Sequence, residues 1–280
     1  RYFHCEEGGG SFLKRKLVDV GVEMVMALQG RYHDSAGGND GSVMEAAEGQ
    51  SVEIEFVGDE KIRSQQRLER LRTASLVRTR VSWVSVEALR AQAPLLGDLD
   101  LRDNLLSRWE DVGHLASALP HLTHLNIGNN KMRPFLPSSH LPLLHFPSLR
   151  VLVLSATGIS FPHAAQIAAQ LPTLEELHIC DNNLDTLQIH EDGEEGEGDG
   201  GGGGRGEGEE EVHLTAESVA TCFPTLHTLS LNGNKFSDWK ALWGLRFLRR
   251  LRRLLLNDNP LPSISYAPSL ADQPLPIEDP

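Results

Sequence analysis

Two pairs of side chains in the sequence could begin a metal site. His178 and Cys180 are two residues apart, and His121 and His124 are three apart. Imidazole and thiolate are common zinc ligands, but a zinc site needs three or four protein ligands. No third or fourth ligand lies near the first pair, and no carboxylate follows the histidines at metalloprotease spacing. The sequence therefore predicts no metal site.

Nucleophilic and phosphate-binding patterns are also incomplete. Ser11 follows three glycines but does not stand in a Gly-x-Ser-x-Gly elbow. The Gly-x-Gly patterns between residues 191 and 211 are not flanked by a strand or a helix, as a phosphate loop would be. Trp109 and Trp239 occupy matching places in a repeat, which favours packing over a cofactor site. We expect no catalytic residues, no bound cofactor and no enzymatic activity.

The charge of the chain is unevenly distributed. The net charge is −13 over 280 residues, and residues 191–211 hold ten acidic residues and one arginine, a net of −9. The rest of the chain is therefore nearly balanced, which argues against nucleic-acid binding because that needs a basic face. A run of acids and glycines is usually a solvated loop, and a tether for a basic partner is the alternative.

Cysteine content and hydropathy indicate the cellular compartment. The chain has three widely separated cysteines and no apolar run of 18 residues. It therefore has too few cysteines for a disulfide scaffold and no membrane span. We expect a monomer in the reducing cytoplasm.

A pattern Leu-x-x-Leu-x-Leu-x-x-Asn-x-Leu recurs along the chain. Its third apolar position falls at residues 76, 101, 127, 154, 179, 231 and 256, so six intervals are 25, 26, 27, 25, 52 and 25 residues. This period matches the leucine-rich repeat. The 52-residue interval contains the acidic stretch and no further copy of the pattern. We interpret it as one repeat with an acidic, Gly-rich insertion at 188–213 that leaves from the helical side.

Each position of the repeat has a structural role. In Leu-x-Leu both leucines point into the core and the residue between them points outward, as in a strand. The asparagine bonds backbone groups that the turn leaves unpaired, and Thr157 replaces it in one repeat. Helical spacing of apolar residues follows, as in 109–119 and 161–171. The sequence predicts an α/β leucine-rich-repeat solenoid with parallel strands on the concave face and helices on the convex face.

The N-terminal residues have a different pattern. Residues 1–22 read as a strand, a Gly-rich turn and a strand, and they resemble the C-terminal part of a CAP-Gly domain, with Phe12 and Lys14 in its loop and following strand. With the repeats behind it, the chain resembles the tubulin folding cofactor E (tubulin-specific chaperone E) family. Four further segments support the resemblance: ALQGRY at 27–32, the lead-in at 56–76, DNLLSRWEDV at 103–112 and VLVLSATGI at 151–159.

The resemblance implies a function and partners. It implies a chaperone that binds α-tubulin, works with other tubulin folding cofactors after the chaperonin step, and helps to assemble or dissociate the α/β heterodimer. It also implies association with the cytoskeleton. The alternative is a cytosolic leucine-rich-repeat adaptor or regulatory subunit of a phosphatase or ciliary complex, without a chaperone role.

We expect four regions and one binding face. The regions are the CAP-Gly remnant (1–22), a linker with a helix (23–66), the repeats (67–265) and a Pro-rich disordered tail (266–280). The concave face is the usual binding surface of a solenoid. The outward positions of its strands supply the candidate partner-binding residues: Asp98, Asp100, Arg102, His124, Asn126, Val151, Val153, Glu176, His178, Ser230 and Arg253. A basic cluster in the last repeat could bind an acidic tail or pair with the acidic insertion: Arg246, Arg249, Arg250, Arg252 and Arg253.

Overall fold

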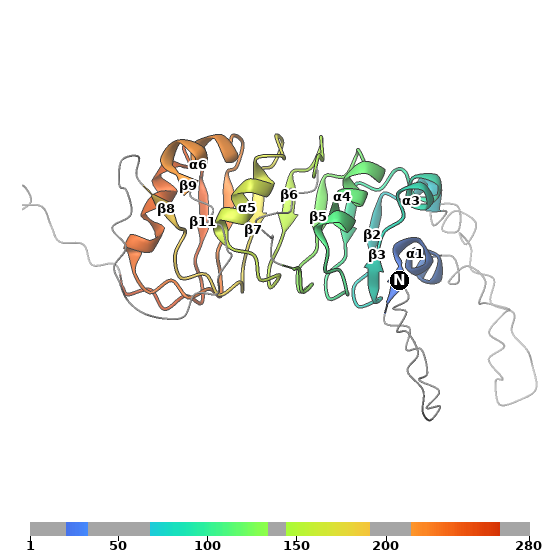
Figure 1. Cartoon of the computed structure of the whole chain (residues 1–280), viewed down its shortest axis with the longest axis horizontal. Coiled ribbons are helices and arrows are strands. Elements are labelled where there is room, and N and C mark those ends of the chain that lie inside the picture. The colour runs from blue at the N-terminus through green and yellow to red at the C-terminus, as the bar shows by residue number, and fades with distance from the viewer. Residues whose placement is uncertain (1–20, 33–67, 134–143, 191–213, 264–280) are drawn as a thin grey trace, which may run out of the picture.

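A computed structural model describes residues 21–32, 68–133, 144–190 and 214–263 (Figure 1). The predicted CAP-Gly remnant with Phe12 and Lys14, the core of the acidic insertion and the C-terminal tail lie outside these residues. Within the described part, most of the strands form one long sheet and the helices follow one another along one side of it (Figure 1).

Seven short parallel strands, one from each predicted repeat, form this sheet. Their order is β11-β10-β7-β6-β5-β4-β2, so each strand pairs with that of the next repeat. The register aligns the central residue of every strand, from Ala74 through Leu99 to Leu254. The sequence repeat is therefore confirmed. The strands are β2 (Thr73–Ser75), β4 (Asp98–Asp100), β5 (His124–Asn126), β6 (Val151–Val153), β7 (Glu176–His178), β10 (Thr228–Ser230) and β11 (Arg253–Leu255).

The helices cover one face of the sheet with their apolar sides. In α4, Val112, Leu115 and Ala116 are buried at helical spacing. Trp109 begins α4 and is buried, and its indole nitrogen donates to Arg133 O at 3.0 Å, so it packs as the sequence suggested. The leucine-rich-repeat fold class is confirmed. The helices are η2 (Leu68–Arg70), α3 (Val86–Gln92), α4 (Trp109–Ala118), α5 (Phe161–Ala168), α6 (Ala216–Cys222) and η3 (Trp239–Phe247).

The start of the predicted linker belongs to the repeat core. Strand β1 (Val22–Glu23) pairs with β3 (Val81–Trp83), and α1 (Met24–Tyr32) buries Met24, Val25 and Leu28 against the first repeat. The Glu23 carboxylate, 7% exposed, accepts hydrogen bonds from Val25 N at 2.7 Å and Ser85 N at 3.2 Å. The described residues 22–32 therefore pack on the first repeat.

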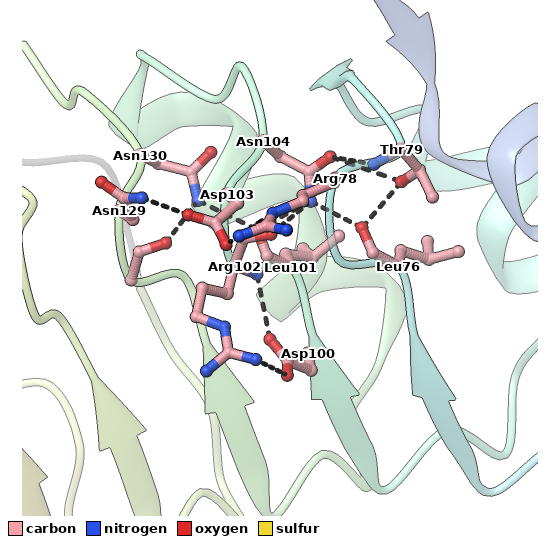
Figure 2. A network of polar contacts seen from close by, with 11 residues as sticks. Leu76, Arg78, Thr79, Asp100, Leu101, Arg102, Asp103, Asn104, Asn129 and Asn130 are labelled. Carbon is pink, nitrogen blue, oxygen red and sulfur yellow. Dashed lines mark hydrogen bonds and ion pairs between the residues drawn. The ribbon is translucent and has the colours of Figure 1, made fainter.

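Buried asparagines connect successive repeats. Asn104 donates to Leu76 O at 2.7 Å and to Leu101 O at 2.8 Å (Figure 2). Its side-chain oxygen accepts from Val81 N at 3.0 Å. The Thr157 hydroxyl in the equivalent position donates to Leu154 O at 2.7 Å and has a longer contact with Asn182 Oδ1 at 3.5 Å. The predicted ladder is therefore present, and each amide satisfies backbone groups of two repeats. Its members are Asn104, Asn130, Asn182, Asn234 and Asn259.

The long interval holds one repeat with an insertion. β7 pairs directly with β10, with Leu177 opposite Leu229, although 52 residues separate them. Short parallel strands β8 (Ile189–His190) and β9 (Leu214–Thr215) flank the insertion, and α6 follows β9. The sequence interpretation of a single interrupted repeat is therefore confirmed, and the flanking strands β8 and β9 lie beside α6.

Candidate binding face

The face of the sheet opposite the helices, called here the open sheet face, carries the predicted binding residues. Side chains alternate along each strand, so the residues on either side of the buried central leucine point away from the core. Asp98, His124 and Arg253 are exposed, and so is Arg102 just beyond its strand. The half-buried positions are Asp100, Asn126, Val151, Val153, Glu176 and His178.

The strand register places these residues in two rows across the sheet. Neighbouring strands lie about 4.8 Å apart, so side chains from distant repeats become adjacent. The apolar centre formed by Val151 and Val153 has polar neighbours on both sides. The first row is Asp98, His124, Val151, Glu176, Thr228 and Arg253, and the second is Asp100, Asn126, Val153, His178, Ser230 and Leu255.

Two polar side chains in the second row already form hydrogen bonds within the protein. The Asp100 carboxylate accepts from Arg102 N at 3.0 Å and lies 3.9 Å from the Arg102 guanidinium (Figure 2). The Asn126 side-chain oxygen Oδ1 accepts from Gly128 N at 2.9 Å. A Cβ atom at Gly128 would lie 3.1 Å from Asn126 Oδ1 and 3.2 Å from Ser155 O. The side chains of Asp100 and Asn126 therefore bond to the backbone just beyond their own strands. Glycine at 128 leaves the space beside Asn126 Oδ1 and Ser155 O that a Cβ atom would crowd.

Ser230 is not accessible, contrary to the sequence prediction. Only 1% of it is exposed, and its hydroxyl lies 3.1 Å from Cys180 Sγ. Thr228 on the same strand is 4% exposed. Both side chains are small and lie between larger residues of β7 and β11. The alternation along the strand predicted correctly which way these side chains point, but it did not predict that they are buried.

His178 and Cys180 lie on the open sheet face but turn to different neighbours. His178 Nε2 is 3.6 Å from Glu176 Oε2, whereas Cys180 Sγ contacts Ser230. In the part of the chain that the structure describes, no group of three or more His, Cys, Asp or Glu side chains could hold a metal ion.

A row of charged residues at the start of the strands was missed by the sequence analysis. Glu175 lies 3.4 Å from Arg150 on one side and 3.7 Å from His227 on the other. Each of these residues directly precedes its strand, one position before the outward residues that alternation identifies. All three residues occupy the same position of the repeat, and this shared position is the sequence signal from which the row could have been predicted. This row adds the Arg150–Glu175 ion pair and the neighbouring His227 imidazole to the edge of the open sheet face.

The basic cluster of the last repeat divides into two parts. The Arg246 guanidinium stacks over the rings of Trp243, at 4.8 Å, and Phe247, at 4.3 Å. The other four arginines are exposed and have no carboxylate within ion-pair distance among the residues that the structure describes. They are Arg249, Arg250, Arg252 and Arg253.

Groups with a shifted pKa lie on the helical side, away from the open sheet face. Burial raises the pKa of Asp111 in α4 above its ordinary value of 3.8, and nearby Arg108 opposes this shift. Burial also raises the pKa of the Cys222 thiol at the end of α6. A cavity between Trp109 and Phe146 is apolar and has a volume of about 10 Å³, about the space of one water molecule. These features belong to the packing of the solenoid.

The chain is similar to curated proteins from animals and a plant. It is 30% identical over 269 residues to tubulin-specific chaperone E of Xenopus laevis, which covers 95% of this chain and 45% of the relative. It is 28% identical over 268 residues to the Homo sapiens protein of the same name, with the same coverage. It is 31% identical over 262 residues to tubulin-folding cofactor E of Arabidopsis thaliana, covering 92% of this chain and 44% of the relative.

Two other comparisons add little. No protein-family model matches the chain. Among solved structures, an internalin C2 from Listeria monocytogenes aligns with a TM-score of 0.42 and 20% identity, covering 85% of this chain and 86% of that one. The fold assignment rests instead on the strand register and the asparagine ladder. In the described residues no helix has the length and hydropathy needed to cross a membrane.

The chain spans about half the length of the curated relatives it matches. The similarity nevertheless extends across the repeats and nearly all of this chain. The resemblance drawn from the sequence motifs is confirmed: this chain is a partial-length homologue of the proteins named tubulin-specific chaperone E or tubulin-folding cofactor E.

Proposed function

We propose that this protein acts as a tubulin folding cofactor and binds α-tubulin through its repeats. The observation that carries the proposal is the similarity to proteins named tubulin-specific chaperone E over 95% of the chain. The match covers 45% of the relative, so the activity of that whole protein is part of the proposal. Cooperation with other tubulin folding cofactors and association with the cytoskeleton belong to it as well.

The open sheet face is the proposed contact surface. Its half-buried centre at Val151 and Val153 is bordered by His124, Glu176 and His178. An apolar centre with a polar rim suits a protein surface, whereas a small molecule needs an enclosed pocket. Ser230 is buried and is no longer a candidate contact.

The proposed mechanism is differential binding. A chaperone of this kind changes an equilibrium only if it binds one conformation or assembly state of its client better than another. A rigid solenoid supplies a fixed surface for such selection. Preferential binding of α-tubulin outside the heterodimer would favour dissociation, and release to β-tubulin would favour assembly. No catalytic group is required for either direction.

The test is a pull-down of α-tubulin from purified α/β-tubulin by the full chain and by a double variant, Val151→Lys and Val153→Lys. Two lysines can extend from half-buried positions, so the fold is retained while the apolar centre becomes charged. The matched control is Met26→Lys with Leu105→Lys, at exposed apolar positions away from the strands of the open sheet face. Circular dichroism and thermal melting check the fold of each variant.

We expect the Val151 and Val153 variant to bind tubulin at least about tenfold more weakly, and the control to bind as the unaltered chain does. Equal binding by both variants would place the contact elsewhere. An unaltered chain that does not bind α-tubulin at all would contradict the proposal and favour an adaptor role for the repeats.

A further inference from the structure

The end of the sheet at β11 is less covered than the rest of the sheet. Like β2 at the opposite end, β11 has a paired strand on one side only among the residues that the structure describes. Its central residue Leu254 is 37% exposed, whereas the equivalent Leu99, Leu152 and Leu229 are at most 3% exposed. A partly uncovered apolar strand at a sheet edge is a site at which another strand can add.

The backbone groups of this edge are arranged to receive a parallel strand. In each earlier repeat, one carbonyl before the strand accepts two N–H groups of the next strand, as His227 O does from Arg252 N and Arg253 N at 2.9 Å. The equivalent carbonyl of the last repeat is Arg252 O. Likewise Leu231 N donates to Leu255 O at 2.8 Å and Gly233 N to Asn257 O at 2.9 Å. The equivalent donors, Leu256 N and Asp258 N, have no acceptor in the described part of the chain.

Positive charge surrounds the same edge. Arg253 begins β11, Arg252 directly precedes it, and Arg249 and Arg250 lie in the turn before them. All four are exposed, and none forms an ion pair with a described residue. In contrast, Arg78 lies 3.4 Å from Asp103, and Arg150 lies 3.4 Å from Glu175. The last repeat therefore presents unpaired cations next to open backbone groups.

We propose that β11 and its arginines form a docking site for an extended, acidic peptide of a partner protein, which adds to the sheet as an eighth strand. Directional backbone groups and exposed Leu254 favour a peptide strand over a lipid surface, because lipid headgroups cannot pair with a sheet edge. A second copy of this chain would bring its own arginines to the same edge, so like charges would oppose that contact. The site lies at the end of the sheet, and it does not depend on the proposed tubulin contact at Val151 and Val153.

The sheet itself indicates the register of the peptide. Glu175 stands beside Arg150 across β6 and β7, and Leu177 packs opposite Leu152. By the same register, the docked strand places glutamates beside Arg252 and Arg253 and a leucine beside Leu254. Its carbonyls accept from Leu256 N and Asp258 N. The preferred sequence is therefore Glu-Glu-Leu-x-Leu or a close variant, which is the type of strand that β7 itself provides.

The experiment measures binding of a fluorescein-labelled peptide with the sequence of residues 173–181, which contains Glu-Glu-Leu and the carbonyls equivalent to both acceptors, by fluorescence anisotropy. The test variant is Arg252→Gln with Arg253→Gln. The matched control is Arg70→Gln with Arg72→Gln, two exposed arginines at the opposite end of the sheet. A second peptide carries lysines in place of both glutamates, and a third has N-methyl groups on alternate backbone nitrogens. Because residues 191–211 are acidic, the unaltered peptide is also tested on a chain in which their carboxylates are changed to amides.

We expect the Arg252 and Arg253 variant to bind about tenfold to a hundredfold more weakly, as loss of two charge-assisted contacts implies. The control should bind like the unaltered chain, and the lysine and N-methyl peptides should bind weakly. Failure of the peptide to bind even the chain with a neutral insertion would overturn the proposal. Equal losses of peptide affinity in the two arginine variants would also overturn it, and so would equal binding of the N-methyl peptide. Arginine-dependent binding to phosphatidylserine vesicles without peptide binding would overturn it as well.

Discussion

Replacing Asn182 with alanine should strongly destabilise the solenoid. Asn182 is 7% exposed, and its amide nitrogen donates to Leu154 O and Cys180 O, both at 3.0 Å. Its side-chain oxygen accepts from Thr157 N at 3.0 Å and Gly158 N at 2.8 Å. Four bonds at about 1 kcal/mol each give a loss of about 4 kcal/mol, because alanine leaves these groups unsatisfied inside the protein.

Two further variants make this prediction specific. Asn182→Thr should lose about 1 kcal/mol less than alanine, because a hydroxyl keeps one donor, as Thr157 does toward Leu154 O. Asn259→Ala should cost only about 1 kcal/mol, because Asn259 is half-buried at the open end of the sheet and water can replace its bonds.

The assay is urea unfolding followed by far-ultraviolet circular dichroism and tryptophan fluorescence. A solenoid is stabilised by contacts between neighbouring repeats, so weakening one interior contact can let the two halves unfold separately. The slope of the free energy of unfolding against urea concentration then also falls. Comparing the two signals detects separate unfolding of the two halves. A loss below about 1 kcal/mol for Asn182→Ala, or a loss equal to that of Asn259→Ala, would refute the argument that the ladder joins the repeats.

Two other predictions concern the turns and a buried carboxyl group. Ala156 has φ of 54°, in the left-handed region that is unfavourable for a residue with a Cβ atom, so Ala156→Gly should raise the free energy of unfolding by about 1 kcal/mol. Gly158 has φ of 79°, so Gly158→Ala should lower the free energy of unfolding for the same reason. Thermal melting of both variants checks the sign of each change. Burial raises the pKa of Asp111 in the fold above 3.8, so its protonated form is favoured there. The unaltered chain should therefore gain stability relative to Asp111→Asn as pH falls through this raised pKa toward 3.8, and lose it as pH rises. Urea unfolding from pH 7 to pH 4 measures the difference, and a constant difference would contradict the assignment.

Much of the architecture could be predicted because its determinants are local and periodic. The spacing of Leu99, Leu101 and Asn104 recurs at every strand and turn, and alternation within a strand fixes which side chains face the core. The same register identified the interrupted repeat, since Leu177 and Leu229 remain in step across the acidic insertion. The family resemblance followed from motifs that lie on this frame.

Only the tertiary structure determined how exposed the outward side chains are and which of them already bond to other groups of the protein. Ser230 is covered because residues about 25 and 50 positions away in sequence stand on either side of it in the sheet. Asp100 turns to its own backbone, Glu23 reaches Ser85 from before the first repeat, and Leu254 remains partly uncovered at the end. These outcomes depend on the sizes and positions of neighbours across strands. A linear period sets the direction of a side chain, whereas its exposure is set by what the fold places next to it.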